Sequence, residues 1–181
     1  MRATAVGRPP RTGRPVLALS LFLLLTSAPG VAQPGSGQVE VRVTDHRAGI
    51  ADFTTLHVEL AEVSLHRRGQ PRGAGWVLAL HGAPPPDVVP LKEGRWVALG
   101  TGHVPTGRYD AVRVRFGSIR GELTRGGVGT MVPDASIVAI DLDVTPEGQH
   151  ALLIDLYVED QSDHRPGLYA VKIQEVRVGS P

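Results

Sequence analysis

The feature that most constrains this chain is a two-residue period of apolar side chains, repeated along most of its length. Val39, Val41 and Val43 alternate with polar residues, and residues 138–144 and 152–158 show the same alternation. A two-residue period places successive side chains on opposite faces of a β-strand, whereas an amphipathic helix needs a period of 3.6. Together with the glycine- and proline-rich turns between segments, it predicts an all-β fold, an antiparallel β-sandwich.

Two of the long segments contain a break in this alternation. The apolar positions jump by three residues, from Leu60 to Val63 and again from Ile173 to Val176. One inserted residue returns both halves of a strand to the same buried face, which is the effect of a β-bulge. We therefore predict a β-bulge within each jump. A helix is the alternative for residues 60–65, and the β-branched residues that flank this segment disfavour it.

The N-terminus has the pattern of a secretory signal peptide. Four arginines precede an apolar run over residues 16–25, and the small residues Gly30 and Ala32 mark a cleavage site. The run is shorter than the ~20 apolar residues that span a bilayer, which disfavours the alternative of an uncleaved membrane anchor. We predict a secreted or periplasmic protein with this organisation: signal peptide 1–32, flexible tether 33–38 and a single β-sandwich domain 39–179.

Charge and cysteine content exclude several classes of function. Cleavage after Ala32 removes four of the 19 Lys and Arg residues and none of the 18 Asp and Glu residues, so the remaining 149 residues carry a charge of −3. This charge gives no basis for nucleic acid as a partner, and we expect no membrane span after cleavage. Without cysteine there is no disulfide framework, thiolate zinc site or cysteine nucleophile.

Five short landmarks occur in a fixed order along the chain: Val39–Asp45, Thr55–Arg67, Val104–Val114 with its Pro-Thr-Gly-Arg-Tyr sequence, Leu152–Leu156 and Tyr169–Val178. In this order they resemble a family of secreted bacterial domains known as domain-of-unknown-function family 4382, over nearly all of residues 39–178. The resemblance implies a prealbumin-like or carbohydrate-binding-like β-sandwich, for which we expect Greek-key connections. It implies no catalytic residues.

Acidic residues in the last third of the chain are candidate metal ligands. Asp141, Asp143 and Asp155 occupy alternate strand positions, and calcium sites of secreted proteins use oxygen ligands of this kind. The alternative is a solvated strand face, because the chain has no Asp-x-Asp-x-Asp-Gly loop. His57 and Glu59 would project from one strand face without a visible third ligand. Calcium is thus the one candidate cofactor, and otherwise we expect none.

The aromatic residues suggest where a ligand would bind. Sugar-binding surfaces combine exposed aromatic rings with polar hydrogen-bonding groups, and Trp76, Trp96 and Tyr157 are the candidates for such rings. By parity Tyr157 points outward. The alternative is that both tryptophans cap the core of the sandwich. An exposed Trp76 or Trp96 would favour glycan binding.

The sequence contains no convincing catalytic motif. Gly117-Ser118 lacks the Gly-x-Ser-x-Gly order of a nucleophile elbow, and Ser118 is expected in a turn. We therefore predict an exported, non-enzymatic module of the bacterial cell envelope with a binding or structural role and a cell-envelope glycan or protein as partner. Recognition would use the loops at residues 69–75 and 82–87. A carbohydrate-binding module is the first alternative. A small hydrolase is the second, favoured if buried titratable residues converge in one pocket.

Overall fold

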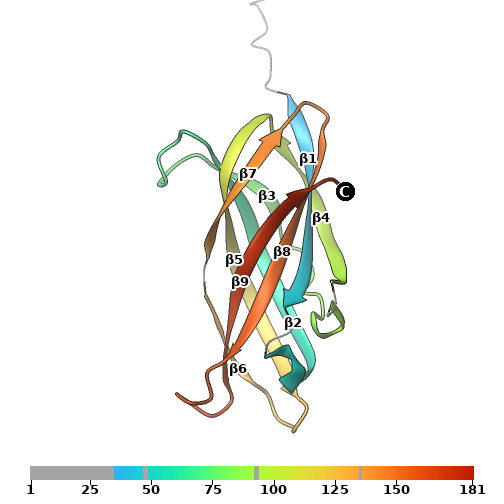
Figure 1. Ribbon diagram of the computed structural model, residues 1–181, viewed down its shortest axis with the longest axis vertical. Helices are drawn as coiled ribbons and strands as arrows, with labels where there is room; N and C mark the ends of the chain where they lie inside the picture. The colour runs from blue at the N-terminus through green and yellow to red at the C-terminus, as the bar shows by residue number, and fades with distance from the viewer. Residues whose placement is uncertain (1–34, 47–48, 92–93, 135) are drawn as a thin grey trace, which may run out of the picture. The chain divides into compact units, whose positions relative to one another are not determined.

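The computed structural model describes residues 35–46, 49–91, 94–134 and 136–181 (Figure 1). These residues form β-strands and two short 3-10 helices, η1 (Ile50–Asp52) and η2 (Val89–Leu91). No helix among them is long and apolar enough to cross a membrane. The predicted signal peptide lies outside the described residues. The strands are β1 (Ser36–His46), β2 (Phe53–Arg67), β3 (Trp76–His81), β4 (Trp96–Pro105), β5 (Gly107–Leu123), β6 (Thr130–Pro133), β7 (Ile137–Val144), β8 (Gln149–Asp160) and β9 (Leu168–Gly179).

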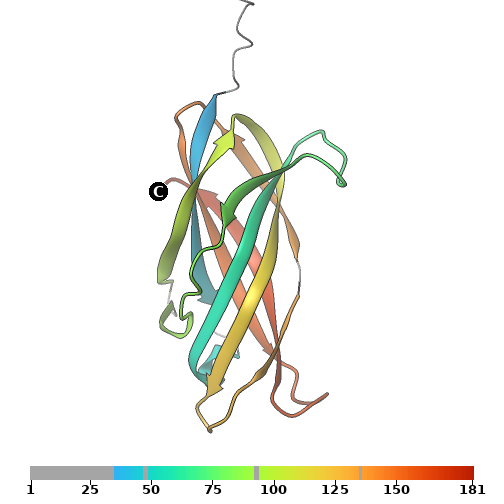
Figure 2. The same ribbon diagram turned by 180° about the vertical axis from the view of Figure 1, so that it is seen from behind.

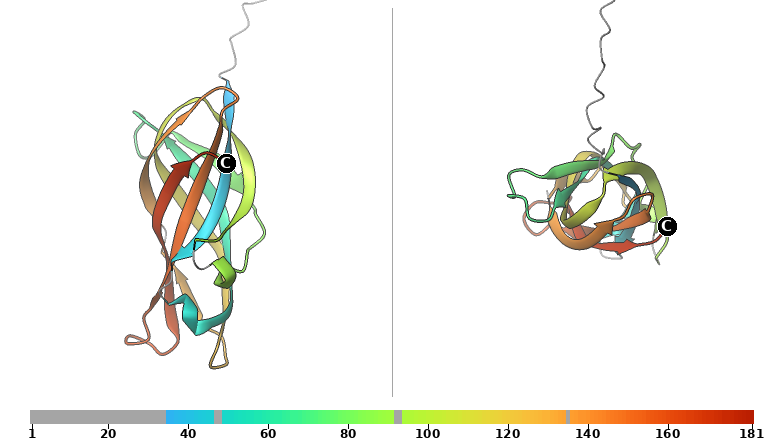
Figure 3. Two further views of the ribbon diagram at one scale, coloured as in Figure 1. Left: turned by 45° about the vertical axis from the view of Figure 1, so that its right-hand side comes forward. Right: turned by 90° about the horizontal axis from the view of Figure 1, so that it is seen from above.

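The strands form two β-sheets, as the alternation predicts. One sheet has five strands in the order β4-β1-β8-β9-β6, and the other has four in the order β3-β2-β5-β7. Seen from above, the strands surround a common interior (Figure 3). Side chains from both sheets form one buried core, which includes the predicted inward residues Val39, Val41 and Val43 of β1. Burial of this apolar surface is the main force that holds two such sheets together.

Both predicted β-bulges are confirmed. In β2 the register against β5 shifts between Leu60 and Glu62. In β9 the residues opposite Asp155 and Leu156 of β8 are Glu175 and Ile173, so Gln174 is the extra residue. After the bulge in β2, Val63 and Leu65 return to the core, and after the bulge in β9, Val176 packs against it, whereas Val178 near the end of the strand is exposed.

The five-stranded sheet is mixed, so the expectation of a purely antiparallel sandwich is wrong at two places. β1 runs parallel to β8, and β6 runs parallel to β9. Parallel neighbours need a long crossover, and between β1 and β8 the chain forms all four strands of the other sheet together with β4 and β6. Alternation fixes which face of a strand is buried and carries no information about the direction of its neighbour.

β1 begins earlier than the alternation indicates. Ser36, Gly37 and Gln38 fall within the predicted tether, but they pair with the last residues of β4. A side chain at Gly37 would place its Cβ 2.7 Å from the carbonyl oxygen of Thr145. The small residues here allow close packing against the turn between β7 and β8. Because they include no apolar side chain, they show no alternation from which this part of the strand could be predicted.

Tyr109 fixes the corner where the chain passes from β4 to β5. Its side chain is fully buried, and its hydroxyl donates a 2.7 Å hydrogen bond to the carbonyl oxygen of Pro105, the last residue of β4. Burial raises the pKa of Tyr109, because the phenolate would be poorly solvated. Since β4 and β5 belong to different sheets, this bond holds a connection between the two layers.

Replacing Tyr109 with phenylalanine should lower the free energy of unfolding by about 1 kcal/mol, the usual net value of one intramolecular hydrogen bond. The ring still fills its space, so the loss reports on the hydroxyl alone. Urea denaturation followed by circular dichroism would measure it. A midpoint equal to that of the wild type would show that the bond to Pro105 adds nothing to stability.

Candidate functional site

The solvent-facing side of β4, β1 and β8 brings together several of the predicted site residues. We call it the Trp96 face and define it by Glu40, Arg42, Trp96, Asp155 and Tyr157. Because the valines of β1 point into the core, Glu40 and Arg42 between them point outward. Trp96 lies opposite Thr44 of β1, and paired residues project to the same side of a sheet.

Trp96 is the exposed aromatic residue of this face, with 46% of its surface accessible. The guanidinium carbon of Arg42 lies 4.0 Å from the centre of the indole ring, within the range of a cation–π interaction. Arg42 is held there by Glu40, which accepts a 2.7 Å hydrogen bond from its Nε and forms an ion pair with its Nη2. The indole is thus fixed in position and still reachable by a ligand.

A small polar pocket continues the Trp96 face along β1. Its volume is about 190 Å³, and its walls supply amide, hydroxyl and carboxylate groups: Gln38, Glu40, Thr101, Gln149, His150 and Pro181. Glu40 belongs to both the pocket and the ion pair with Arg42. At ~3.3 Å per residue, the six steps along β1 from Gln38 to Thr44 place the pocket and the indole roughly 20 Å apart at most.

Asp155 is a candidate metal ligand from the sequence, with a solvated strand face as the alternative, and the structure shows that it is not solvated. Asp155 does lie on the outer face of β8, but it is only 6% exposed. It stands between Thr44 of β1 and Glu175 of β9. Nη2 of Arg177 lies 3.7 Å from Oδ2 of Asp155, while its Nε donates a 2.9 Å bond to Glu175.

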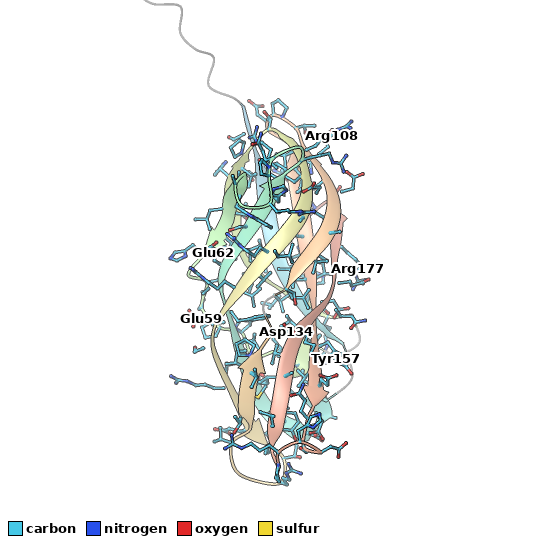
Figure 4. All side chains as sticks on the ribbon, turned by 90° about the vertical axis from the view of Figure 1, so that its left-hand side faces the viewer. Glu59, Glu62, Arg108, Asp134, Tyr157 and Arg177 are labelled. Carbon is cyan, nitrogen blue, oxygen red and sulfur yellow. The ribbon has the colours of Figure 1, made fainter. Side chains whose placement is uncertain are left out.

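Tyr157 points outward as predicted and is half-buried. It lies opposite Lys172 of β9, whose ammonium nitrogen is 2.8 Å from Glu159. The hydrogen bond from Lys172 lowers the pKa of Glu159, so that carboxylate stays ionised beside the tyrosine. Figure 4 shows Tyr157 and Arg177 on one side of the sandwich, with Glu59 and Glu62 on the opposite side.

The three candidate calcium ligands are not brought together. Asp141 and Asp143 lie on β7 in the four-stranded sheet, whereas Asp155 lies on β8 in the other. Asp141 pairs with Arg68 at 2.8 Å, and Asp143 with Arg108 at 3.7 Å. Within the part of the chain that the structure describes, no group of three His, Asp or Glu side chains could hold a metal ion.

Trp76, the third aromatic candidate, positions a loop on the other sheet. It is half-buried, its Nε1 donates a 2.9 Å hydrogen bond to the carbonyl oxygen of Arg72, and the guanidinium of Arg113 lies 4.4 Å from its ring centre. The segment between β2 and β3, which contains the predicted recognition loop 69–75, projects from the sheet in Figure 2. Trp76 anchors the base of this loop.

His66 supports the same loop through contacts that no sequence pattern indicates. Its side chain is only 1% exposed, with Nδ1 2.7 Å from Asp110 and Nε2 3.2 Å from the carbonyl oxygen of Pro71. The ring also packs edge-on against Trp76 at 5.0 Å. The bond to His66 lowers the pKa of Asp110. The 44 residues between His66 and Asp110 explain why only the folded structure reveals the pair.

A second pair of side chains that the sequence does not predict lies between the middle of β2 and the C-terminal half of β5. Ser118 lies in β5 and not in a turn, and both its amide and its hydroxyl donate to Oε2 of Glu59, at 2.8 and 2.9 Å. The bond from the amide is the largest cause that lowers the pKa of Glu59, followed by that from the hydroxyl. His57 is exposed on the same face, opposite Arg120. Glu59 is therefore occupied by Ser118 and is not placed as a metal ligand with His57.

The buried aspartate, glutamate, histidine, lysine and arginine side chains among the described residues do not meet in one place. These are Asp45, His66 and Asp155. Asp45 and Asp155 lie on different strands of the five-stranded sheet, and their alternation places them on opposite faces; His66 belongs to the other sheet.

Comparison with known proteins gives one match. Residues 36–169 match the model of a family described as Domain of unknown function (DUF4382). Searches of curated proteins and of solved structures found no match. The matched range runs from the start of β1 into β9 and includes every residue that defines the Trp96 face. The chain therefore belongs to the DUF4382 family, as its landmarks suggested.

Proposed function

We propose that this protein is an exported, non-enzymatic β-sandwich module of the bacterial cell envelope that binds a ligand on the Trp96 face. The signal-peptide pattern supports export. The absence of catalysis is supported by the carboxylates, since a general acid at neutral pH needs a raised pKa. Local hydrogen bonds lower the pKa of five described carboxylates, which makes these five poor general acids: Glu59, Glu62, Asp110, Glu159 and Asp160.

The most specific form of this proposal is a carbohydrate-binding module, and the exposure of Trp96 is the observation that carries it. An aromatic ring on a flat sheet face can pack against the C–H groups of a sugar, while nearby amide, hydroxyl and carboxylate groups bind its hydroxyls. The indole of Trp96 and the polar pocket at Gln38, Glu40 and Thr101 supply both parts on one surface. Arg42 and Glu40 connect them.

We also propose a more specific type of sandwich fold for this protein. A prealbumin-like or carbohydrate-binding-like sandwich with Greek-key connections is supported by the order of the strands, since β1 lies between β4 and β8 and β2 between β3 and β5. Non-adjacent strands that become neighbours in this way are typical of Greek-key connections.

Replacing Trp96 with alanine should weaken the binding of a recognised glycan by about 5- to 150-fold, because loss of a central aromatic contact commonly costs about 1 to 3 kcal/mol. A glycan array with the wild-type protein identifies the ligand, and a titration then compares the variant. Trp96→Phe, which keeps a ring, should retain part of the affinity.

The matched control for this experiment is Leu78→Ala, which removes a 52% exposed apolar side chain from β3 of the other sheet. Glycan binding should be unaffected in this variant. If the wild-type protein bound no glycan, or if Trp96→Ala and Leu78→Ala bound equally well, the carbohydrate proposal would be wrong. The broader proposal of a non-enzymatic envelope module would then need a protein partner.

A further inference from the structure

One arginine on β5 differs from the others on the outer face of that strand. Arg108, Arg113 and Arg115 each form an ion pair with a carboxylate. Arg120 forms no ion pair with any residue that the structure describes. Arg113 and Arg115 share the carboxylate of Glu62, and Arg108 pairs with Asp143, so the guanidinium group of Arg120 is the one without a carboxylate partner among the described arginines of this face.

Arg120 lies in a pocket of about 380 Å³ where the N-terminal end of β2 meets the C-terminal end of β5. Its lining combines a cation, a carboxylate, an imidazole, a hydroxyl and an apolar rim: Thr55, His57, Arg120, Gly121, Glu122 and Val128. The strand register places Arg120 opposite His57 and Glu122 opposite Thr55. Paired residues project to the same side of a sheet, so these four polar side chains face the same volume.

The guanidinium group of Arg120 and the carboxylate of Glu122 both line this pocket without pairing with each other. Glu59, the nearest outward carboxylate along β2, is occupied by the amide and hydroxyl of Ser118. Glu122 is two residues from Arg120 on the same strand, a spacing of roughly 6.6 Å, and the two form no ion pair. A cation and a hydrogen-bond acceptor are thus both free to contact a ligand.

We propose that this Arg120 pocket binds a sugar that carries a carboxylate, such as a uronic acid. The guanidinium fork of Arg120 matches the two oxygens of a carboxylate. Glu122, Thr55 and His57 bind the hydroxyl groups of the ring, and Val128, 74% exposed at the rim, packs against its C–H face. This second site goes beyond the proposed function, because it lies on the sheet opposite the Trp96 face.

The test is a titration of the purified protein with glucuronate, glucose and inorganic phosphate, followed by chemical shifts in an NMR spectrum. Glucuronate should bind, and glucose should bind at least about tenfold more weakly, because it lacks the charged group. Arg120→Gln should weaken glucuronate binding by a similar factor. Arg115→Gln is the matched control, since Arg115 lies on the same strand and face but is paired with Glu62, and it should bind normally.

Equal binding of glucose, or of phosphate, would overturn the assignment of an acidic sugar, and so would normal glucuronate binding by Arg120→Gln. Trp96→Ala separates this site from the proposed one. It should bind glucuronate as the wild type does, even if the Trp96 face recognises no glycan at all. Loss of glucuronate binding in Trp96→Ala but not in Arg120→Gln would place the ligand on the Trp96 face and refute the Arg120 pocket.

Discussion

Gly102→Ala should destabilise the protein by about 3 kcal/mol or more, a large fraction of the 5–15 kcal/mol that stabilises a typical domain. Gly102 lies in β4 at the edge of the five-stranded sheet, and Ala79 lies in β3 at the edge of the other. A Cβ on Gly102 would overlap the carbonyl oxygen of Ala79 and lie 2.8 Å from its carbonyl carbon. Both atoms are backbone, so the clash can be relieved only by separating the two strands.

Gly179→Ala is the matched control for this prediction. Gly179 is also in a strand, β9, and a Cβ there meets nothing within 4 Å. Neither glycine has the positive φ that would strain an alanine. Gly179→Ala should therefore change the free energy of unfolding by less than about 0.5 kcal/mol. Urea denaturation of both variants measures the difference. A Gly102→Ala variant as stable as the control would show that β3 and β4 can separate freely.

The alternation of apolar residues was sufficient to predict the buried face of the long strands, such as β1 and β8. It also located both bulges, because an inserted residue changes the parity of the pattern at a definite point, as at Gln174. It could not predict the parallel neighbours β1 and β8. Pairing direction depends on where the intervening strands go, and a two-residue period is the same in both directions.

For single residues of the candidate site, the two-residue period likewise predicts the direction of a side chain but neither its sheet nor its exposure. Parity correctly places Tyr157 on an outer face, and the structure adds that Trp96, which the sequence left between the core and the surface, is exposed on the same sheet. Parity also places Asp141, Asp143 and Asp155 on outer faces, but of different sheets, so a shared calcium site does not form. An outward direction does not ensure exposure either, since Asp155 is covered between its neighbours on β1 and β9.

The polar pairs of the four-stranded sheet lie beyond sequence reasoning altogether. Glu59 and Ser118 are 59 residues apart, and His66 and Asp110 are 44 apart. Each pair forms because β2 and β5 adopt one particular register, which the bulges help to set. A glutamate, a serine or a histidine in a strand carries no local sign of such a partner. The Arg120 pocket depends on the same register.

Leu156→Ala should destabilise the protein by about 2–5 kcal/mol, the usual cost of a buried leucine truncation. Leu156 is fully buried, and its strand, β8, lies between β1 and β9 in the five-stranded sheet. It stands opposite Asp45 on one side and Ile173 on the other. Two contributions make up this loss. The removed methyl groups no longer gain free energy by leaving water, and the cavity that they leave stays partly open because the two packed sheets cannot close around it.

The control is Leu78→Ala, the same substitution at a residue that is 52% exposed on the edge strand β3. Because water already reaches this side chain and no closed cavity forms, the expected loss is below about 1 kcal/mol. Equilibrium denaturation in urea gives both values, and similar slopes would show that the variants unfold from the same compact state. Equal losses in the two variants would mean that Leu156 is not enclosed between the sheets, which would contradict the sandwich itself.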